Sequence, residues 1–194
     1  DESLKPGHII LTIILSLAFA LLLFKAIPLL IAKGLSSIST LNDLTFNIID
    51  GLSRISIFLL YLFAISKIED VKVMFQYHGA EHASISCYEK GDKLTPKNVL
   101  KHSTIHRRCG TNFIFLTLIL SILVFSIVPT DLAYHKLLLL RLPLVLPIAG
   151  ISYEFLKLGA KKSRLLRTLT LPGLWLQKIT TKKPNEKQAE GAIA

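Results

Sequence analysis

Long apolar runs alternate with polar segments along the chain, and each run is close to the length that a membrane requires. The four runs cover residues 9–32, with an interruption at Lys25, and residues 46–66, 113–128 and 137–158. A helix needs about 20 apolar residues to cross the bilayer core, and an isolated strand cannot satisfy its backbone in lipid. The pattern therefore predicts an all-α integral membrane protein with about four transmembrane helices.

These runs divide the chain into four regions. We expect two membrane helices in residues 1–66 and a polar helix-loop-helix segment in residues 67–110. Two further membrane helices should follow in residues 111–158, and a basic interfacial segment with a polar tail in residues 159–194. In the last region, leucines and Trp175 lie among basic residues, which is typical of segments at the lipid headgroups. We expect Pro172-Gly173 to break this segment in two and residues 180–194 to form a mobile tail.

Composition and charge agree with a membrane protein and give it an orientation. Hydrophobic residues make up 51% of the chain and charged residues 19%. Soluble domains have about 45–50% and about 25% respectively. This high apolar content excludes a disordered chain. Of the 23 Lys and Arg residues, 18 lie before the first run, in residues 67–110, or at and after the end of the fourth run. Only two lie in the other two connections. The positive-inside rule therefore places the N-terminus, the middle segment and the C-terminus in the cytoplasm.

The net charge of +10 also bears on partners. In a membrane protein, an excess of Lys and Arg points to the lipid membrane and its headgroups rather than to nucleic acid. Two cysteines cannot form a disulfide scaffold.

Ionisable residues inside the apolar runs have more than one interpretation. Asp50 and Arg54 are four residues apart, so they share a helix face and can pair. The pair lies near the membrane surface, or it forms a polar patch that holds helices together or lines a cavity. We expect Arg141 to extend its side chain to the interface. Glu154, beside Tyr153 at the cytoplasmic end of the last run, is close enough to the middle segment to belong to a site there.

Metal-ligating side chains concentrate in the middle segment. Four of the six histidines lie between residues 78 and 106, and both cysteines lie in or just after this stretch. On a helix, His78 and His82 share a face and can hold one ion, while Glu81 lies beside it. The letters H-x-x-E-H match the inverted zincin order, in which the glutamate is a general base.

A second chelating group follows. His102 and His106 are also four residues apart, and Cys109 follows His106 with His-x-x-Cys spacing, which adds a thiolate suited to zinc. Thr95 as N-cap and Pro96 at the first helical position predict a second short helix that carries His102 and His106 on one face. The two groups together predict a tetrahedral zinc site, or a site for another divalent transition metal. The alternative is that these histidines are solvated or face a partner.

Six short blocks after residue 47 are specific enough to suggest a family: YHGAEH, CYE, LTPKNV, HRRCGTNF, LPIAGISYE and PGLWLQKITTKKP. In these blocks the chain resembles the YqhQ-like family of bacterial integral membrane proteins. Such proteins are regarded as metal-dependent enzymes of unknown function, so the resemblance implies an inner-membrane helical fold and a site more than a reaction. That site maps onto His78, Glu81, His82, Glu89, His106, Arg108, Cys109, Gly110, Tyr153 and Glu154. Family members usually have a further N-terminal part with a glycine-rich GGQ-type motif, which these residues do not include.

Three functions remain open at this point. The first is a zinc-dependent hydrolase for membrane-proximal peptides or lipids, with Glu81 as general base and Arg108 binding an oxyanion or anionic substrate group. The second is a non-catalytic accessory protein of a translocation or transport complex, in which the metal is structural and the partner is another membrane protein or a second copy of the chain. The third is a small transporter with Asp50, Arg54 and Arg141 on its path. We interpret Cys87 as a small buried hydrophobic residue.

The charge distribution makes the topology testable. A reporter inserted in residues 89–97 should lie in the cytoplasm, and one inserted in residues 130–134 should lie outside, because of the bias of 18 basic residues against two. Accessibility of each reporter to a membrane-impermeant reagent measures this. The opposite labelling of the two loops would contradict the orientation.

Overall fold

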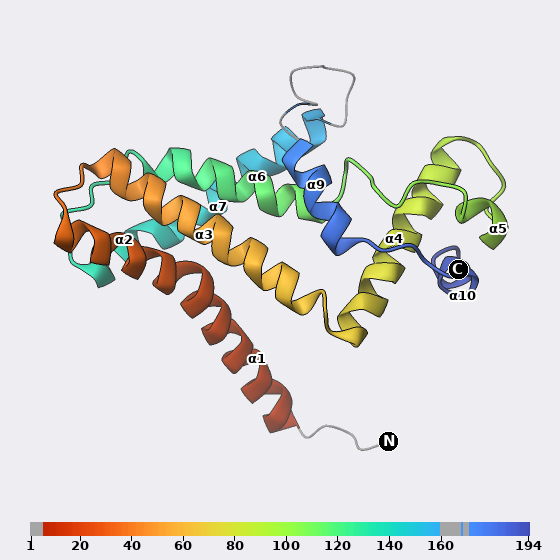
Figure 1. Ribbon diagram of the computed structural model, residues 1–194, viewed down its shortest axis with the longest axis horizontal. Helices are drawn as coiled ribbons and strands as arrows, with labels where there is room; N and C mark the ends of the chain where they lie inside the picture. The colour runs from red at the N-terminus through yellow and green to blue at the C-terminus, as the bar shows by residue number, and fades with distance from the viewer. Residues whose placement is uncertain (1–5, 160–167, 169–170) are drawn as a thin grey trace. The chain divides into compact units, whose positions relative to one another are not determined.

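The computed structural model of the protein describes residues 6–159, 168 and 171–194, and every element in this part of the chain is a helix (Figure 1). The predicted all-α class is therefore confirmed. The elements in chain order are α1 (Pro6–Leu21), the π-helix η1 (Leu22–Ala26), α2 (Ile27–Ile38), α3 (Asp43–Ile65), α4 (Glu69–Glu89), α5 (Pro96–Val99), α6 (Gly110–Phe125), α7 (Tyr134–Gly159), α9 (Leu171–Thr180) and α10 (Glu186–Gly191).

In the described part of the chain, three helices are long and apolar enough to cross a membrane: the continuous stretch Pro6–Ile38, Asp43–Ile65 and His135–Gly159. They correspond to the first, second and fourth predicted spans. The third predicted span is α6, which is apolar but has only 16 residues. At 1.5 Å per residue it is about 24 Å long, shorter than a bilayer core of about 30 Å. Membrane association is thus supported by length and composition, and the count of four spans stays a prediction.

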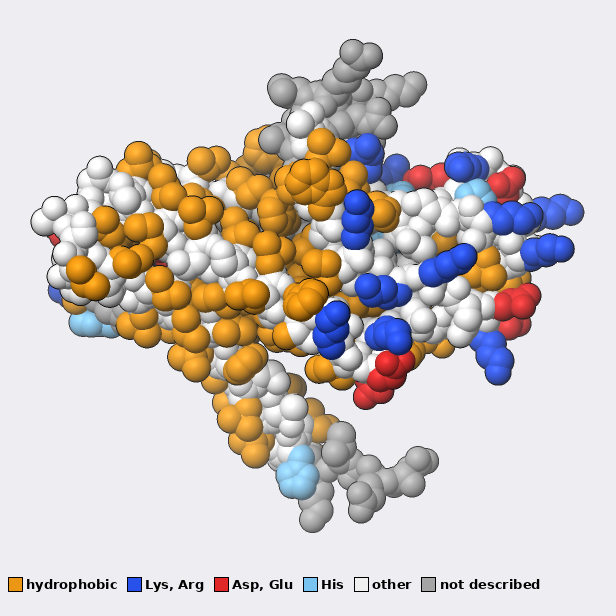
Figure 2. Space-filling view, viewed as in Figure 1, with side chains coloured by type: hydrophobic (Ala, Val, Ile, Leu, Met, Phe, Trp, Pro, Cys, Tyr) orange, Lys and Arg blue, Asp and Glu red, His pale blue; other side chains and the backbone are white. Residues whose placement is uncertain are grey.

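The surface of the first helix is that of a lipid-facing helix. No residue of α1 is buried, and its apolar side chains are exposed all round. A helix that is hydrophobic on every side belongs in a core or in a membrane. Figure 2 shows hydrophobic side chains over α1 and Lys and Arg side chains over the region of α4, α5 and α10.

The chain forms two compact units. The first contains Asp1–Leu59 and Ser121–Val145, and the second contains Leu60–Leu120 and Leu146–Ala194. The helices α3, α6 and α7 each contribute residues to both units. The middle segment and the C-terminal helices belong to the same unit, a grouping that the order of the regions along the chain does not indicate.

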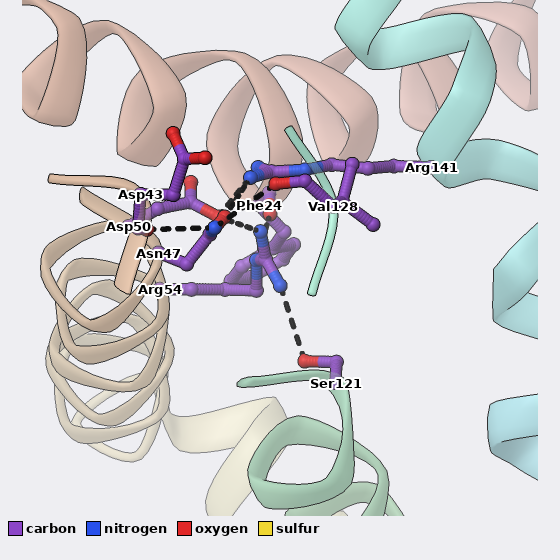
Figure 3. Close-up of polar contacts among 8 residues, drawn as sticks. All are labelled: Phe24, Asp43, Asn47, Asp50, Arg54, Ser121, Val128 and Arg141. Carbon is purple, nitrogen blue, oxygen red and sulfur yellow. Dashed lines mark hydrogen bonds and ion pairs between the residues drawn. The ribbon is translucent and has the colours of Figure 1, made fainter. Parts of the chain in front are cut away.

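A charged cluster is buried within the first unit (Figure 3). Arg54 and Arg141 donate from Nη2 and Nη1 to the same Asp50 Oδ2, at 2.7 and 2.8 Å. Arg141 also donates to the Asn47 amide oxygen, and Arg54 donates to the Ser121 hydroxyl at 3.1 Å. The polar patch on α3 therefore joins α3 to α6 and α7. The prediction that Arg141 reaches the interface is wrong, because its side chain is only 3% exposed and is held by acceptors on α3.

The first helix contributes to this cluster through a local irregularity. In η1 the Ile27 N–H donates to the Leu22 carbonyl, five residues back, which widens the turn that contains Lys25. In this turn the Phe24 carbonyl accepts a hydrogen bond from Arg54 Nε at 3.2 Å. Turns of this kind are rare and frequently occur at functional sites.

The C-terminal residues differ from the sequence prediction. Residues 186–191 form α10, which begins with a capping box between Asn185 and Gln188 and buries Gln188 and Ala189. Because α10 packs against α4, the prediction of a mobile tail is wrong. Pro172 and Gly173 lie in the first turn of α9, where a helix needs no donor, so α9 itself runs through them. The predicted break of the segment at this point stays a prediction. Residues 160–167 and 169–170 of the predicted interfacial region lie outside the described residues.

The buried cluster yields a stability prediction. Asp50→Asn keeps the shape of the side chain but leaves Arg54 and Arg141 without their shared carboxylate. Breaking a buried pair in this way should cost about 3–5 kcal/mol of the free energy of unfolding. Thermal unfolding in detergent measures the loss, and Glu154→Gln is the control, because Glu154 makes an exposed pair with Lys157 at 3.5 Å that is worth about 0–1 kcal/mol. Equal, small effects of both changes would contradict the structural role of the cluster.

Candidate metal centre

Helix α4 carries the first histidine pair and has a face of small residues. Glu69 and Asp70 lie in its first turn, where carboxylates stabilise the positive end of the helix dipole. The helix ends before Gly91, whose φ of +79° is the left-handed conformation common after a helix C-terminus. The buried residues are Gly79, Ala80, His82, Ala83, Ser84 and Cys87. Cys87 is fully buried in a core cluster with Ala83, Val99 and Ala189, as its interpretation as a small hydrophobic residue predicted.

The short helix after the loop begins where the sequence indicated but ends early. The Thr95 hydroxyl accepts a hydrogen bond from the Asn98 N–H, and Pro96 is the first helical residue. The helix ends at Val99, so His102 and His106 lie beyond it in irregular backbone. The prediction that they share a helix face is therefore wrong, because the helix is one turn long.

Three of the five predicted ligands come together. His78 and His82 on α4 meet Cys109, which directly precedes α6, and one ligand atom from each lies within 4.8 Å of the others. The His78 Nε2 to Cys109 Sγ distance is 3.2 Å, and the two imidazole rings have centroids 4.4 Å apart. His102 is outside this group, with its Nε2 at 3.0 Å from Asp92 Oδ2. The His106 ring lies 6.0 Å from that of His82, and its Nε2 faces Glu89 Oε2 at 3.3 Å.

Backbone carbonyls hold both histidine rings of the group. His78 Nδ1 lies 2.8 Å from the Thr180 carbonyl, and His82 Nδ1 lies 2.8 Å from the Thr104 carbonyl. A carbonyl can only accept, so each Nδ1 carries a proton. In the neutral ring Nε2 then presents a lone pair to a metal, and in the protonated ring the Nε2–H donates to the Cys109 thiolate instead. Donation of the second ring nitrogen to a carbonyl is the usual support of a metal-binding histidine.

The surroundings of Cys109 favour its thiolate. Burial raises the pKa of the Cys109 thiol, but hydrogen bonds with His78, His82 and Thr111 outweigh it and lower the pKa to about 5. The position of Cys109 just before the N-terminus of α6 also lowers the pKa of its thiol. The hydrogen bond to Cys109 raises the pKa of His78 against the opposing effect of burial. The thiolate is the form of cysteine that binds metals.

The segment that follows α9 supports α4 at Gly79. A Cβ atom on Gly79 would lie 2.1 Å from the Lys182 carbonyl oxygen, so only glycine allows this approach. The Lys182 N–H donates to the Phe75 carbonyl at 2.8 Å. The approach brings Thr180 to His78, which explains the glycine in the block YHGAEH.

A buried glutamine holds the chain near Cys109. Gln177 of α9 is fully buried and bonds both the N–H and the carbonyl of His106, at 2.9 and 2.8 Å. It also donates to the Asn112 amide oxygen at 3.1 Å. Gln177, Thr180 and Thr104 were not among the predicted site residues. The side-chain amide of Gln177, within the block PGLWLQKITTKKP, was the one visible signal among them. Thr180 and Thr104 act through their backbone carbonyls, which any residue has.

The remaining predicted residues lie around the group rather than in it. Glu81 is exposed on α4, near enough to His78 to raise the pKa of that ring, although it is outside the cluster of ligand atoms. Arg108 is 65% exposed and pairs with Glu89 at 3.4 Å. Glu154 pairs with Lys157, and Tyr153 is exposed. The structure does not join these two residues to the ligand group.

The fold and the site define an all-helical, membrane-associated protein with a candidate centre of two histidines and one cysteine. Residues 1–194 match the family described as "Protein of unknown function (DUF1385)", and the chain belongs to this family. It is 38% identical over 182 residues to "Uncharacterized protein YqhQ" of Bacillus subtilis (strain 168). The match covers 93% of this chain and 57% of that protein, so the chain spans little more than half of its relative's length. No solved structure is significantly similar. The resemblance to YqhQ-like proteins is confirmed.

The contact at Gly79 can be tested by adding one methyl group. Gly79→Ala places a Cβ against the Lys182 carbonyl, so the segment around Lys182 must move and lose its bond to Phe75. Overpacking of this kind costs about 1–3 kcal/mol. We expect a lower unfolding temperature and faster trypsin cleavage after Lys182, since Pro184 blocks cleavage after Lys183.

Gly150→Ala is the matched control, because a Cβ on Gly150 meets nothing within 4 Å and alanine favours a helix over glycine by about 1 kcal/mol. It should leave cleavage and stability unchanged or raise stability. Identical behaviour of the two variants would contradict the close approach of the C-terminal segment to α4.

Proposed function

We propose that the chain binds one zinc ion through His78, His82 and Cys109, and that it is a membrane-embedded metal protein with an open coordination position. The observation that carries this proposal is the support of both rings. Two imidazoles, each with Nδ1 on a backbone carbonyl at 2.8 Å, present Nε2 toward one cysteine sulfur. Two nitrogen donors and one thiolate suit zinc better than magnesium or calcium, which prefer oxygen.

The distances fit such an ion with a small adjustment. Bonds of about 2.0–2.1 Å to nitrogen and about 2.3 Å to sulfur at tetrahedral angles place nitrogen and sulfur about 3.6 Å apart. The His78 Nε2 to Cys109 Sγ distance is 3.2 Å, so an opening of a few tenths of an ångström would admit the ion. Within the described residues the group has three ligands. Three protein ligands are typical of catalytic zinc, and four of structural zinc.

The open position supports a hydrolase for peptides or lipids near the membrane. Zinc in such a position supplies a Lewis acid that polarises a carbonyl or phosphoryl oxygen. Glu81 is exposed and one turn from His78, which suits a base that takes a proton from attacking water. Arg108 is exposed beside Glu89 and can turn toward an anionic substrate group. We place the site at the cytoplasmic face of the bacterial inner membrane, from the distribution of Lys and Arg.

A second function, a structural metal in an accessory protein, has its own supporting observation. The ligands and their supports come from four segments: α4, the loop at Thr104, the start of α6 and the end of α9. An ion there would clamp these segments, as structural zinc does in small domains. A membrane-protein partner or a second copy of the chain is the partner that this function implies.

Metal content tests the site. Purified full-length protein should carry close to one zinc ion per chain by elemental analysis. His78→Ala combined with His82→Ala should abolish binding, because Cys109 alone cannot hold the ion. His102→Ala is the control, since its ring faces Asp92, and it should keep the metal. Full metal retention in the double variant would refute the site.

A change at Glu81 separates the two functions. Glu81→Gln keeps the shape but cannot take a proton, so a hydrolase predicts wild-type metal content and unfolding temperature with loss of complementation in a deletion strain. Full complementation would remove the catalytic function and leave the structural one. Loss of metal in Glu81→Gln would make Glu81 a fourth ligand and contradict its role as a base.

A further inference from the structure

The buried cluster of the first unit contains more positive than negative charge. Lys25, Arg54 and Arg141 all lie against one aromatic ring, at 5.3, 5.4 and 5.0 Å from the Phe125 centroid. Asp50 is the carboxylate that both arginines share. Asp43, the first residue of α3, is not part of the cluster, because it accepts a hydrogen bond from the Thr130 N–H at an exposed position. The cluster therefore carries an excess of two positive charges, and an uncompensated charge inside a helical unit is costly.

The same cluster has unused hydrogen-bonding atoms. Arg141 Nε and Asp50 Oδ1 are buried and have no partner within the described residues. Arg141 and Asp50 are 3% and 1% exposed, so bulk water does not reach them. The Lys25 ammonium contacts the Phe125 ring and makes no hydrogen bond to the described part of the chain. Buried polar atoms normally have partners, so this arrangement of two donors and one acceptor indicates a bound group.

We propose that this cluster binds a protonated phosphate group, either free monohydrogen phosphate or the phosphate monoester of a lipid headgroup. Free monohydrogen phosphate carries two negative charges and keeps one hydroxyl, so it matches the excess of two positive charges. A phosphate monoester, whose second pKa is about 6, keeps a hydroxyl only in its singly charged form, and this is the form that would bind here. Its oxygens accept hydrogen bonds from Arg141 Nε and the Lys25 ammonium. Its hydroxyl donates to Asp50 Oδ1, an atom that would repel an anion without a proton.

The geometry around Lys25 gives the ligand a route and a binding partner. Lys25 is only partly buried, whereas Asp50 and Arg141 are buried, so the phosphate group enters on the side of Lys25. The π-helical turn of η1 presents Lys25 at the cluster, and the bond from Arg54 Nε to the Phe24 carbonyl holds that turn in place. Arg54 already donates from each of its three nitrogens, to Phe24, Ser121 and Asp50. Arg141 Nε has no partner within the described residues, so we assign Arg141 and Lys25 as the donors to the ligand. This site lies in the first unit and does not depend on the metal centre.

Thermal unfolding of the purified full-length protein tests the proposal. In detergent, inorganic phosphate should raise the unfolding temperature in a saturable manner, and sulfate at equal ionic strength should not, because sulfate has no hydroxyl for Asp50. In lipid nanodiscs, phosphatidic acid should stabilise more than phosphatidylglycerol, whose phosphodiester also has no hydroxyl. A response to inorganic phosphate identifies free phosphate as the ligand, and a response to phosphatidic acid alone identifies the lipid.

Lys25→Met separates the site from general salt effects. Lys25 makes no hydrogen bond to the described residues, so its removal leaves none of them unpaired and should leave the ligand-free unfolding temperature at or above the wild-type value. The apparent affinity for the responding phosphate compound should fall at least tenfold. Lys33→Met is the control, because the Lys33 ammonium, on the same helical stretch, donates to the Leu132 carbonyl at 3.0 Å. It should keep the wild-type phosphate response.

Several results would overturn the site. Equal stabilisation by phosphate and sulfate would show a general anion effect, and no response to either phosphate compound would show that the cluster has no such ligand. An unchanged response in Lys25→Met would also contradict the proposal. If Lys25→Met does not fold, Lys25→Gln replaces it, with the same tenfold loss expected.

Discussion

Two hydrogen bonds, from histidine Nδ1 atoms to the carbonyls of Thr180 and Thr104, determine whether the candidate metal centre exists. Without them the rings of His78 and His82 could rotate, and either nitrogen could carry the proton. With them, Nδ1 of each ring is occupied, and Nε2 is the nitrogen left for an ion beside the sulfur of Cys109. Because Thr180 ends α9 and Thr104 lies in the loop before α6, the geometry of the site depends on the packing of three separate parts of the second unit.

That packing depends in turn on small or fully bonded side chains. Gly79 lets the segment after α9 touch α4, and Gly173 lets α9 approach Asn112, where a Cβ would lie 2.2 Å from the amide oxygen. Gln177 then joins α9 to the backbone of His106, three residues before Cys109. The capped helix α10 covers α4 further along, where Gln188 bonds Gln76 at 2.9 Å. These contacts hold the ligands in place before any ion binds, which lowers the cost of binding it.

The sequence predicted the elements well and their tertiary partners poorly, and the reason is physical. Hydrophobic runs and the Thr95-Pro96 cap depend on neighbours in the chain, so the apolar helices and the start of α5 were found. His78, His82 and Cys109 were found because chelation requires particular side chains at particular spacings. The carbonyls of Thr180 and Thr104 carry no such signal, since every residue has a carbonyl.

The errors have the same origin. Arg141 was expected at the interface because a lone arginine in an apolar run is costly, yet Asp50 and Asn47 on α3 supply its acceptors. His102 was grouped with His106 by helical spacing, but the helix ends at Val99, and His102 pairs with Asp92 instead. The sequence predicts a polar tail at residues 186–191 because the side chains that α10 buries, Gln188 and Ala189, are small or polar.

The most direct test of the account is the coordination shell of the bound metal. X-ray absorption at the zinc edge of the purified protein should show one sulfur at about 2.3 Å and two imidazole nitrogens at about 2.0–2.1 Å, with a light atom in the remaining position. In Cys109→Ser the sulfur contribution should disappear. A shell without sulfur, or one that keeps sulfur in Cys109→Ser, would contradict a centre built from His78, His82 and Cys109.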